Sequence, residues 1–519
     1  MSGKVNNALF DLIHSMSKSE KRYFKLMSSR HTIRGEYNYV RLFDFIDKQE
    51  GYNEGKIHDA FQGEAFLNRF SITKKRLYDH ILSALDSFHS IRSVEAQIYR
   101  QLHSADILYE KSLYDQCRRV LNSAEKQARK HELYALLQLV SVKRKRLFET
   151  HGYLSVSDKD LHNLYTVDAA CEAAIHSFNS LWKVKSDLFS RLSRKGVARS
   201  EDEALSYKEI CREVLENRIT STSFETRYLY HHVLSAYHYS VGELTASHKH
   251  LMQNLEMIEQ NELGQKLDIN KHISILTNAI YISDKIGQYK DSLRYLVQLK
   301  KIAAEVESNE DLQIKLFSSI ASIEVSMHLR KGDFSPAKKI AREVEEALEK
   351  YGEKIVSARR AFLEFKLAVV YMGLGDYPEA RRWINRILNE TQLDKTEDII
   401  GFTQLLDLLV HVELDHAKLL PYTFKNTQRF FKTRNRLYSF EKVLLQFFSK
   451  LIRSNDIFER KNLWESLHHE LTKITHDDVF ESVALDYFDF QSWAEAKLKG
   501  TPYDLIVREK YNRSIRAAS

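Results

Sequence analysis

A glycine-centred turn that returns about every 44 residues constrains this chain more than any other feature. The turns read VGELTAS, IGQYKDS, KGDFSPA and LGDYPEA, with their glycines at Gly242, Gly287, Gly332 and Gly375. The successive spacings are 45, 45 and 43 residues. A fixed period of this length is typical of stacked helical units, each of which buries its apolar face against the next. The spacing therefore predicts a repeat array.

Three further copies extend the array toward the N-terminus. KSLYDQC has Ser112 in the glycine position, and the looser copies HGYLSVS and KGVARSE contain Gly152 and Gly196. The gaps from Ser112 onward to Gly242 are 40, 44 and 46 residues, so the period is kept.

Two other columns accompany the turn. A large residue stands two positions after the glycine position, at Tyr114, Leu244, Tyr289, Phe334 and Tyr377. A small residue stands five positions after it, at Cys117, Ser247, Ser292, Ala337 and Ala380. Glycine can end the first helix of a pair in a left-handed conformation at little cost. The small residue then lets the second helix pack closely on the first. Pro336 and Pro378 fall in the first turn of the second helix, where proline is tolerated.

The turn is not a phosphate-binding loop. A P-loop needs Gly-Lys-Ser/Thr after its glycines so that a lysine and a hydroxyl group reach phosphate and metal. GLGDYPEA contains neither residue. We therefore interpret the turn as structural.

Composition agrees with an all-helical chain. Only four prolines and sixteen glycines interrupt 519 residues, and no alternating Val/Ile/Thr run indicates a sheet. We expect an all-α, right-handed α-solenoid of antiparallel helix hairpins with a small helical N-terminal head. The expected regions are a head at 1–95, repeats at 96–390, and C-terminal helical repeats with a cap at 391–519.

Charge and cysteine content restrict the partners and the compartment. The net charge of +7, from 78 basic and 71 acidic residues, permits an acidic partner or nucleic acid without requiring either. The three cysteines are widely spaced and form no CxxC pair, which favours reduced thiols and a cytoplasmic location. No signal peptide or membrane span is expected from the sequence.

The best copy of the repeat resembles the tetratricopeptide family. Its signature places are filled by Leu367, Ala368, Tyr371, Gly375, Tyr377 and Ala380. The family unit has roughly 34 residues, so each helix here would be about a turn longer. The whole chain also resembles bacterial proteins that join a short helical head to such repeats, a likeness that implies no activity.

The resemblance implies a non-enzymatic scaffold or adaptor that binds a peptide or protein segment in a concave groove. In the family, groove positions precede the turn glycine by 13, 10, 6 and 3 residues, and these spacings share one helical face. The candidate groove residues are Asp106, Tyr109, His232, Tyr239, Thr277, Tyr281, Asp284, Phe365 and Met372. Burial of Phe365 under later helices is the alternative for that position.

The head suggests a second function. The stretch NRFSITKKRLYDHILSALDSF resembles a helix-turn-helix recognition segment, with Thr73 as a cap after the turn. Lys74, Lys75 and Arg76 would then lie near phosphates or base edges. The alternative is a packing cap for the solenoid, in which a capping box at SKSE and a helix at 39–49 support a small core.

A second basic stretch lies near the C-terminus. It contains Lys425, Arg429, Lys432, Arg434 and Arg436, interleaved with aromatic residues. Such a pattern can bind single-stranded nucleic acid through phosphate contacts and stacking. The alternative is that the aromatic residues form core and the charges face solvent. Together with the head, this stretch defines the alternative function of a nucleic-acid-binding regulator whose repeats sense a ligand.

No motif indicates catalysis. HExxH, zinc-type Cys/His spacing and a nucleophile beside a base are all absent from the sequence. His231 with His238, and the stretch HHELTKITHDD, are ordinary surface or core histidines on this reading. We therefore expect no enzyme activity, no cofactor and no metal, and a C-terminal tail that caps the array.

Overall fold

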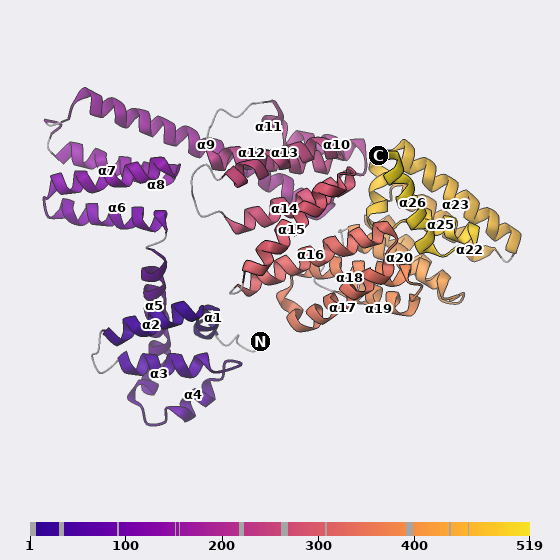
Figure 1. Ribbon diagram of the computed structural model, residues 1–519, viewed down its shortest axis with the longest axis horizontal. Helices are drawn as coiled ribbons and strands as arrows, with labels where there is room; N and C mark the ends of the chain where they lie inside the picture. Colours follow the sequence, from indigo (N-terminus) through magenta and orange to yellow (C-terminus); the bar gives the residue numbers. More distant parts are fainter. Residues whose placement is uncertain are drawn as a thin grey trace. The chain divides into compact units, whose positions relative to one another are not determined.

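The computed structural model describes residues 7–30, 36–90, 93–150, 152–154, 156–216, 223–260, 268–306, 309–390, 398–434, 437–454 and 456–518. Every regular element in this part of the chain is a helix, which confirms the all-α fold class (Figure 1). The chain forms two compact units. The first is Met1–Ile175 with Glu307–Glu310, and the second is His176–Val306 with Asp311–Ser519. The predicted region bounds at 95 and 390 stay predictions.

The first unit contains the head and the earliest helix pair. Its helices are α1 (Ala8–Ser15), α2 (Lys18–Arg30), α3 (Glu36–Asp47), α4 (Glu54–Ala60), η1 (Ala65–Arg69), α5 (Phe70–His89), α6 (Val94–Glu110), α7 (Tyr114–Lys130) and α8 (Tyr134–Thr150). The predicted capping box is confirmed at the start of α2. The Ser17 backbone N–H donates to Glu20 Oε2 at 2.6 Å, and the Glu20 N–H donates to Ser17 Oγ at 3.3 Å.

The helix-turn-helix expectation for the head is wrong in one detail. Helix α5 already begins at Phe70, so Thr73 lies inside the helix and does not cap it. The Thr73 hydroxyl is buried and donates back to the Arg69 carbonyl at 3.2 Å. Leu77 and Ile81 are fully buried on the same helix and form its core face.

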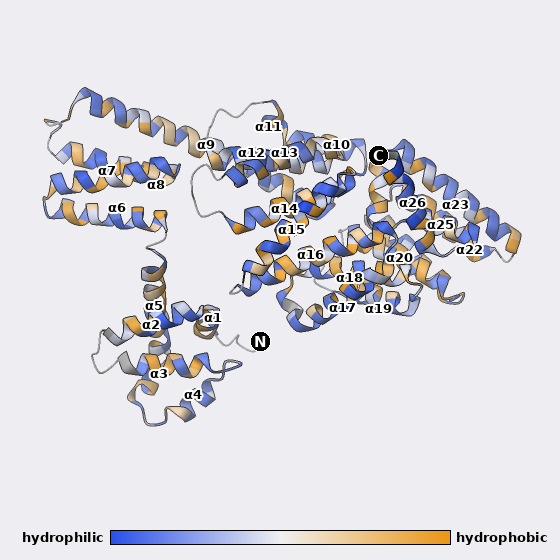
Figure 2. Cartoon of the chain, viewed as in Figure 1, coloured by the Kyte–Doolittle hydropathy of each residue, from blue (hydrophilic) through white to orange (hydrophobic). Residues whose placement is uncertain are grey.

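The second unit contains the main helix array. Helix α9 (Asp158–Lys195) leads into it, followed by α10 (Glu201–Ile210), α11 (Arg212–Glu216), α12 (Phe224–Ser240), α13 (Leu244–Gln260), α14 (Ile269–Lys285), α15 (Tyr289–Glu305), α16 (Glu310–Lys331), α17 (Phe334–Tyr351) and η2 (Gly352–Lys354). The remaining elements are α18 (Ser357–Gly373), α19 (Tyr377–Asn389), α20 (Asp398–Glu413), α21 (Leu420–Arg434), α22 (Ser439–Arg453), α23 (Ile457–Asp477), α24 (Val479–Ser482), η3 (Val483–Asp486), α25 (Phe490–Lys499) and α26 (Tyr503–Ala518). Figure 2 shows hydrophilic and hydrophobic residues interleaved along these helices, as expected for elements with one buried face.

The repeated turn has the predicted backbone. Gly242, Gly287, Gly332 and Gly375 have φ between 72° and 81°, and Ser112 has φ of 59° in the same position. The residue after each of these five donates its backbone N–H to the carbonyl five positions earlier, at 2.8–2.9 Å. This is the Schellman hydrogen bond, which satisfies a carbonyl at the end of the first helix.

The small residues five positions after the turn glycine are packed closely, as predicted. Cys117, Ser247, Ser292, Ala337 and Ala380 are at most 2% exposed. The two serines add a hydrogen bond to the close packing, because each donates to a carbonyl of the first helix. Ser247 Oγ donates to the Ser235 carbonyl at 2.8 Å, and Ser292 Oγ donates to the Ile280 carbonyl at 3.2 Å. The confirmed fold class is thus an all-α solenoid built on these pairs.

Two parts of the array differ from the simple pattern. Between Gly152 and Gly196, where a helix pair with its own turn is expected, a single 38-residue helix (α9) runs without interruption. A further turn follows α20, where Asp415 has φ of 52° and His416 donates its N–H to the His411 carbonyl at 3.0 Å. The sequence columns did not reveal this copy.

The C-terminal residues 478–511, here called the returning segment, run back along the repeated turns. The side chain of Val479 lies at Gly242, and the Tyr511 ring lies 5.9 Å from the Tyr289 ring. At Gly332 the approach is closest, since a Cβ there would lie 2.6 Å from the Asp504 carbonyl oxygen. The tail therefore packs along the turns of earlier repeats, and not only against the last helix pair.

Candidate functional site

The two groove candidates of the first unit are occupied by neighbouring side chains. Asp106 forms an ion pair with Lys143 at 2.5 Å. The Tyr109 hydroxyl lies 2.6 Å from Thr150 Oγ1, and the Arg146 guanidinium lies 3.9 Å from its ring centre. Both side chains are half-buried and connect α6 to α8.

Three other candidates lie in the core of the second unit. Phe365 is 1% exposed, Met372 4% and His232 8%. The His232 ring stacks between Phe189 and Tyr228. Phe365 is covered by Tyr487 of the returning segment, at 6.0 Å between ring centres. These side chains therefore contribute to packing, and a partner surface has to be sought among the remaining candidates.

The structure brings the remaining candidates together with residues that the spacing did not predict. We call this set the inner-face cluster; it consists of Tyr239, Tyr281, Lys285, Arg330, Lys366 and Asp486. The first helices α12, α14, α16 and α18 supply the first five residues, and η3 supplies Asp486. The rings of Tyr239 and Tyr281 meet edge to face at 6.0 Å. Thr277 stays outside the cluster and donates to the Ile273 carbonyl at 2.7 Å.

Most charges of the cluster are paired. Lys285 forms an ion pair with Asp486, whose carboxylate also accepts the Tyr281 hydroxyl at 3.4 Å. Arg330 pairs with the candidate Asp284 and donates to its backbone carbonyl at 2.8 Å. Asp284 is thus held by a cation of the next first helix.

Lys366 is the exception. The residue is 9% exposed, and among the described residues its ammonium group donates no hydrogen bond and forms no ion pair. Its Nζ atom lies 5.2 Å from the centre of the Phe362 ring. Burial lowers the pKa of Lys366 to about 8; Asp486 opposes this effect, and Lys285 and Arg330 add to it. With Asp284 counted beside Asp486, three cations stand against two carboxylates, so the charge of Lys366 is in excess.

The tyrosines beside it are hydrogen-bond donors. Burial raises the pKa of Tyr239 to about 12 and that of Tyr281 well above its ordinary value, so both hydroxyls keep their protons. Tyr281 is nevertheless 36% exposed. A ligand that reaches Tyr281 can thus meet a neutral hydroxyl group, and Asp486 links that hydroxyl to the surroundings of Lys366.

A second buried cation, in contrast, is paired with two carboxylates. Arg199 is 2% exposed and forms ion pairs with Glu441 and Glu481, both at 3.1 Å. Its guanidinium also lies over the Tyr438 ring at 4.6 Å. Burial disfavours the charge of Arg199, but the two carboxylates raise its pKa above the ordinary value. This network joins residues more than 240 positions apart and is structural.

The basic candidates of the head are only partly available. Lys74 pairs with Glu54 at 2.7 Å and donates to the Tyr52 hydroxyl at 3.2 Å. Lys75 and Arg76 are exposed. In the C-terminal basic stretch, Arg429 and Lys432 are exposed on α21, whereas the Arg434 side chain and all of Arg436 lie outside the described residues.

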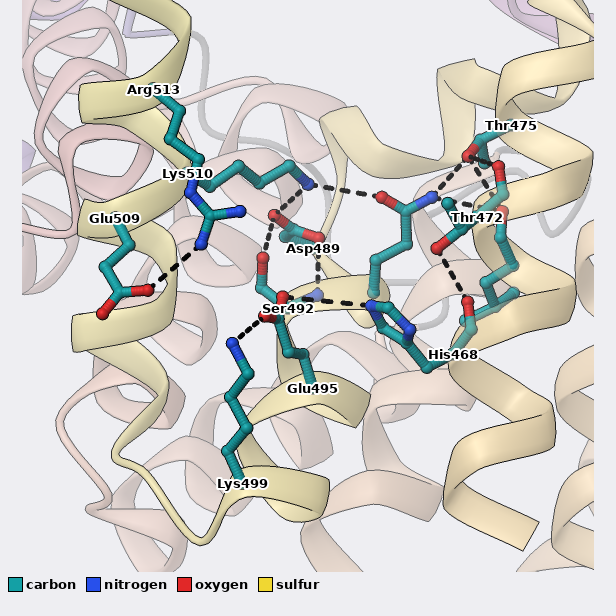
Figure 3. Close-up of polar contacts among 12 residues, drawn as sticks. His468, Thr472, Thr475, Asp489, Ser492, Glu495, Lys499, Glu509, Lys510 and Arg513 are labelled. Carbon is teal, nitrogen blue, oxygen red and sulfur yellow. Dashed lines mark hydrogen bonds and ion pairs between the residues drawn. The ribbon is translucent and has the colours of Figure 1, made fainter. Parts of the chain in front are cut away.

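The stretch HHELTKITHDD lies on α23 and takes part in a polar network with α25 and α26 (Figure 3). His468 Nε2 lies 3.9 Å from Glu495, which also binds Lys499 at 2.6 Å. Asp489 accepts from Ser492 Oγ and from Lys510, both at 2.7 Å. Among the described residues no group of three His, Cys, Asp or Glu side chains has the geometry of a metal site.

The remaining chemical candidates are packed or mutually paired. His231 and His250 approach at 3.0 Å between their Nδ1 atoms, and burial lowers the pKa of His250 to about 4. Burial also raises the pKa of the Cys171 thiol to about 11 and that of Cys211 to about 12, which leaves both unreactive near neutral pH. None of the described helices is both long and apolar enough to cross a bilayer.

Comparison with known proteins adds little to this geometry. No protein-family model and no curated protein matches the chain. Among solved structures, the chain is similar to the crystal structure of the apo form of RapI, with 12% identity and a TM-score of 0.40. The match covers 78% of this chain and 99% of that one. At this level of similarity the functional argument rests on the chain's own residues.

Proposed function

We propose that this protein is a non-enzymatic interaction scaffold that binds a protein or peptide segment at the inner-face cluster. We further propose that the repeats are of the tetratricopeptide type and that the protein acts in a bacterial cytoplasm. The observation that supports a binding site is the largely buried Lys366, whose ammonium group forms no ion pair among the described residues, near the same Asp486 that the partly exposed Tyr281 contacts.

The chemistry of the cluster selects the ligand group. A buried ammonium group without a partner destabilises the fold, and a negatively charged group placed beside it removes that penalty. A carboxylate, from an acidic side chain or a chain terminus, would accept a hydrogen bond from the Lys366 ammonium group. Asp486 already supplies one such carboxylate, but it is paired with Lys285. The ligand would therefore bring the second.

The solenoid favours this mode of recognition. The first helices hold the cluster residues through packed cores and Schellman turns, so the site is formed before the ligand arrives. A preformed surface limits the entropy lost on binding to that of the ligand segment. Tyr239 and Thr277 of the second unit remain candidate contacts, and Asp106 and Tyr109 remain separate candidates in the first unit.

A peptide library derived from the native proteome, presented to the full-length chain, tests the proposal. Wild type should enrich segments with an acidic residue or a free C-terminus. Lys366→Met should lose that enrichment while its helical circular dichroism stays unchanged, and Lys339→Met, at an exposed lysine of α17, should retain it. Enrichment that survives Lys366→Met would place the site elsewhere, and no enrichment by wild type would reject the scaffold function.

The alternative function is a nucleic-acid-binding regulator. Of its candidate contacts in the head, Lys75 and Arg76 are exposed. Binding of the full chain to generic duplex DNA, with a steep dependence on salt, would support it. Charge reversal of Lys75 and Arg76 should then remove binding. Absence of binding by wild type at low salt would reject this alternative.

A further inference from the structure

The net positive charge of the chain is concentrated in one short segment. Residues 416–454 contain nine Lys/Arg and one Asp/Glu, a surplus of eight, whereas the whole chain has a surplus of seven. The other 480 residues are therefore close to neutral. A surplus of this density produces a local positive potential that attracts anionic surfaces.

The only carboxylate of the segment does not neutralise the surface. Glu441 is 2% exposed and forms an ion pair with Arg199. Helix α21 contains no acidic residue at all. The exposed charges of α21 and α22 are thus uniformly positive.

The cations form two rows along neighbouring helices. On α21 the exposed residues Tyr422, Lys425, Arg429 and Lys432 follow at helical spacing, and on α22 the exposed residues Lys442, Gln446, Lys450 and Arg453 do the same. Among the described residues, no ion pair or hydrogen bond involves the side chains of these six cations or of Lys418 just before α21. We call the exposed cations of these two neighbouring helices the basic face; it extends roughly 20 Å along the 15 residues of α21.

Exposed apolar side chains gather at one edge of this basic face. Helices α21, α22 and α23 are joined by short connections and pack in sequence, so neighbours run antiparallel. The start of α21, the end of α22 and the start of α23 therefore lie at the same edge. Leu419 is 45% exposed there, Tyr422 69%, Ile457 83% and Phe458 78%.

We propose that this basic face and its apolar edge bind the surface of an anionic lipid bilayer. The cations would contact the negative headgroups, and Ile457 and Phe458 would insert at the boundary between headgroups and acyl chains. This inference does not depend on the proposed function at the inner-face cluster, because the two sites share no residue.

The structure favours a bilayer over single-stranded nucleic acid. Stacking on bases requires exposed aromatic rings along the basic row. Phe431 is 4% exposed and Phe440 is fully buried, so Tyr422 is the exposed ring of the row. The aliphatic side chains of Leu419 and Ile457 offer nothing to a base or a phosphate, but they suit a hydrocarbon boundary.

Sedimentation of the full-length protein with lipid vesicles tests the proposal. Vesicles of phosphatidylcholine with about 30% phosphatidylserine should bind the protein, and vesicles of phosphatidylcholine alone should bind it at least about tenfold more weakly. Binding should weaken as salt approaches about 1 M, where the screening length falls to about 3 Å.

Two variants and a matched control separate charge from insertion. Lys425→Gln with Arg429→Gln and Lys432→Gln should weaken vesicle binding about a hundredfold, because each lost charge contributes a factor of about five. Ile457→Ser with Phe458→Ser should weaken it roughly tenfold and leave its salt dependence unchanged. The control, Lys339→Gln with Arg342→Gln and Lys350→Gln, removes the same charge from α17, where Glu343, Glu346 and Glu349 lie nearby. It should change binding less than about threefold.

The proposal is overturned if wild type does not bind the anionic vesicles, or if the α21 variant and the α17 control lose binding equally. It is also overturned if wild type does not bind the vesicles but binds a single-stranded oligonucleotide through the same three cations. Loss of binding through the cations alone, with no effect of the Ile457 and Phe458 changes, would contradict insertion.

Discussion

Replacement of Lys366 by methionine is expected to stabilise the protein at neutral pH. Burial lowers the pKa of Lys366 from its ordinary 10.5 to about 8. Because each pH unit of pKa difference corresponds to about 1.4 kcal/mol, the charged side chain costs about 3 kcal/mol at pH 7. Methionine fills a similar elongated space without a charge. Loss of the cation–π contact with Phe362 removes about 0.5–1 kcal/mol. The expected net gain is therefore on the order of 2 kcal/mol.

The gain should depend on pH in a defined direction. The unfolded chain holds the Lys366 proton up to about pH 10.5, whereas the folded chain releases it near pH 8. Between these values the unfolded state binds more protons, so the wild-type free energy of unfolding receives a contribution that rises with pH. The advantage of Lys366→Met should be largest below pH 8 and should shrink toward pH 10.5.

Urea unfolding of wild type and variant at about pH 7 and about pH 10 measures both effects. Lys339→Met, at an exposed lysine of α17, is the matched control and should change stability by less than about 0.5 kcal/mol at either pH. A Lys366→Met variant that is less stable than wild type at pH 7 would refute the reasoning. A gain of equal size at both pH values would show that the burial of charge is not its cause.

Three further substitutions test the turns and the buried network. Gly332→Ala should lower the free energy of unfolding by more than Gly287→Ala, although both glycines have positive φ. A Cβ at Gly332 would lie 2.6 Å from the Asp504 backbone and 2.8 Å from the Arg508 backbone, whereas a Cβ at Gly287 would meet nothing within 4 Å. Amide hydrogen exchange in α26 should become faster in Gly332→Ala and stay unchanged in Gly287→Ala. Equally fast exchange in both variants would contradict the packing of the returning segment against Gly332. Ser112→Gly should raise thermal stability by up to about 1 kcal/mol, since serine pays for φ of 59°, and a lower melting temperature would contradict that turn. Arg199→Met should cost about 3–5 kcal/mol in urea unfolding, because Glu441 and Glu481 are left buried without a cation, and a loss below about 1 kcal/mol would show that the pair is not needed.

The turns were predictable from sequence because one backbone conformation restricts the residue. Glycine is the residue that adopts positive φ most cheaply, so its period of about 44 residues is visible, and the period then located Ser112 without a glycine. The turn at Asp415 was missed because aspartate, which tolerates this conformation, replaces glycine and Ala417 replaces the large residue. The continuous helix α9 was also missed, although residues 158–195 contain no glycine or proline to end it.

The site was only half predictable. Helical spacing placed Tyr239, Tyr281 and Asp284 on one face, and these residues do lie around the inner-face cluster. Spacing alone could not show that Asp486, about 200 positions later, packs against them. Lys366 lies outside the four family positions. Its signal is a lysine within the apolar run FLEFKLAVVYM, where a charge is rarely buried without a reason.

The contrast between Arg199 and Lys366 separates structure from function in this chain. Both are buried cations of the second unit, and both would be costly if left alone. Arg199 has two carboxylates and an aromatic ring, so its retention is explained by the contacts that it makes. Among the described residues Lys366 has an aromatic ring but no ion pair, and a methionine would serve the fold better. A residue that lowers stability and makes no compensating contact is best explained by a partner that the folded chain does not contain. We propose that the missing contact is a ligand carboxylate at Lys366 Nζ, and on this proposal the same substitution is expected to raise stability and to remove ligand binding.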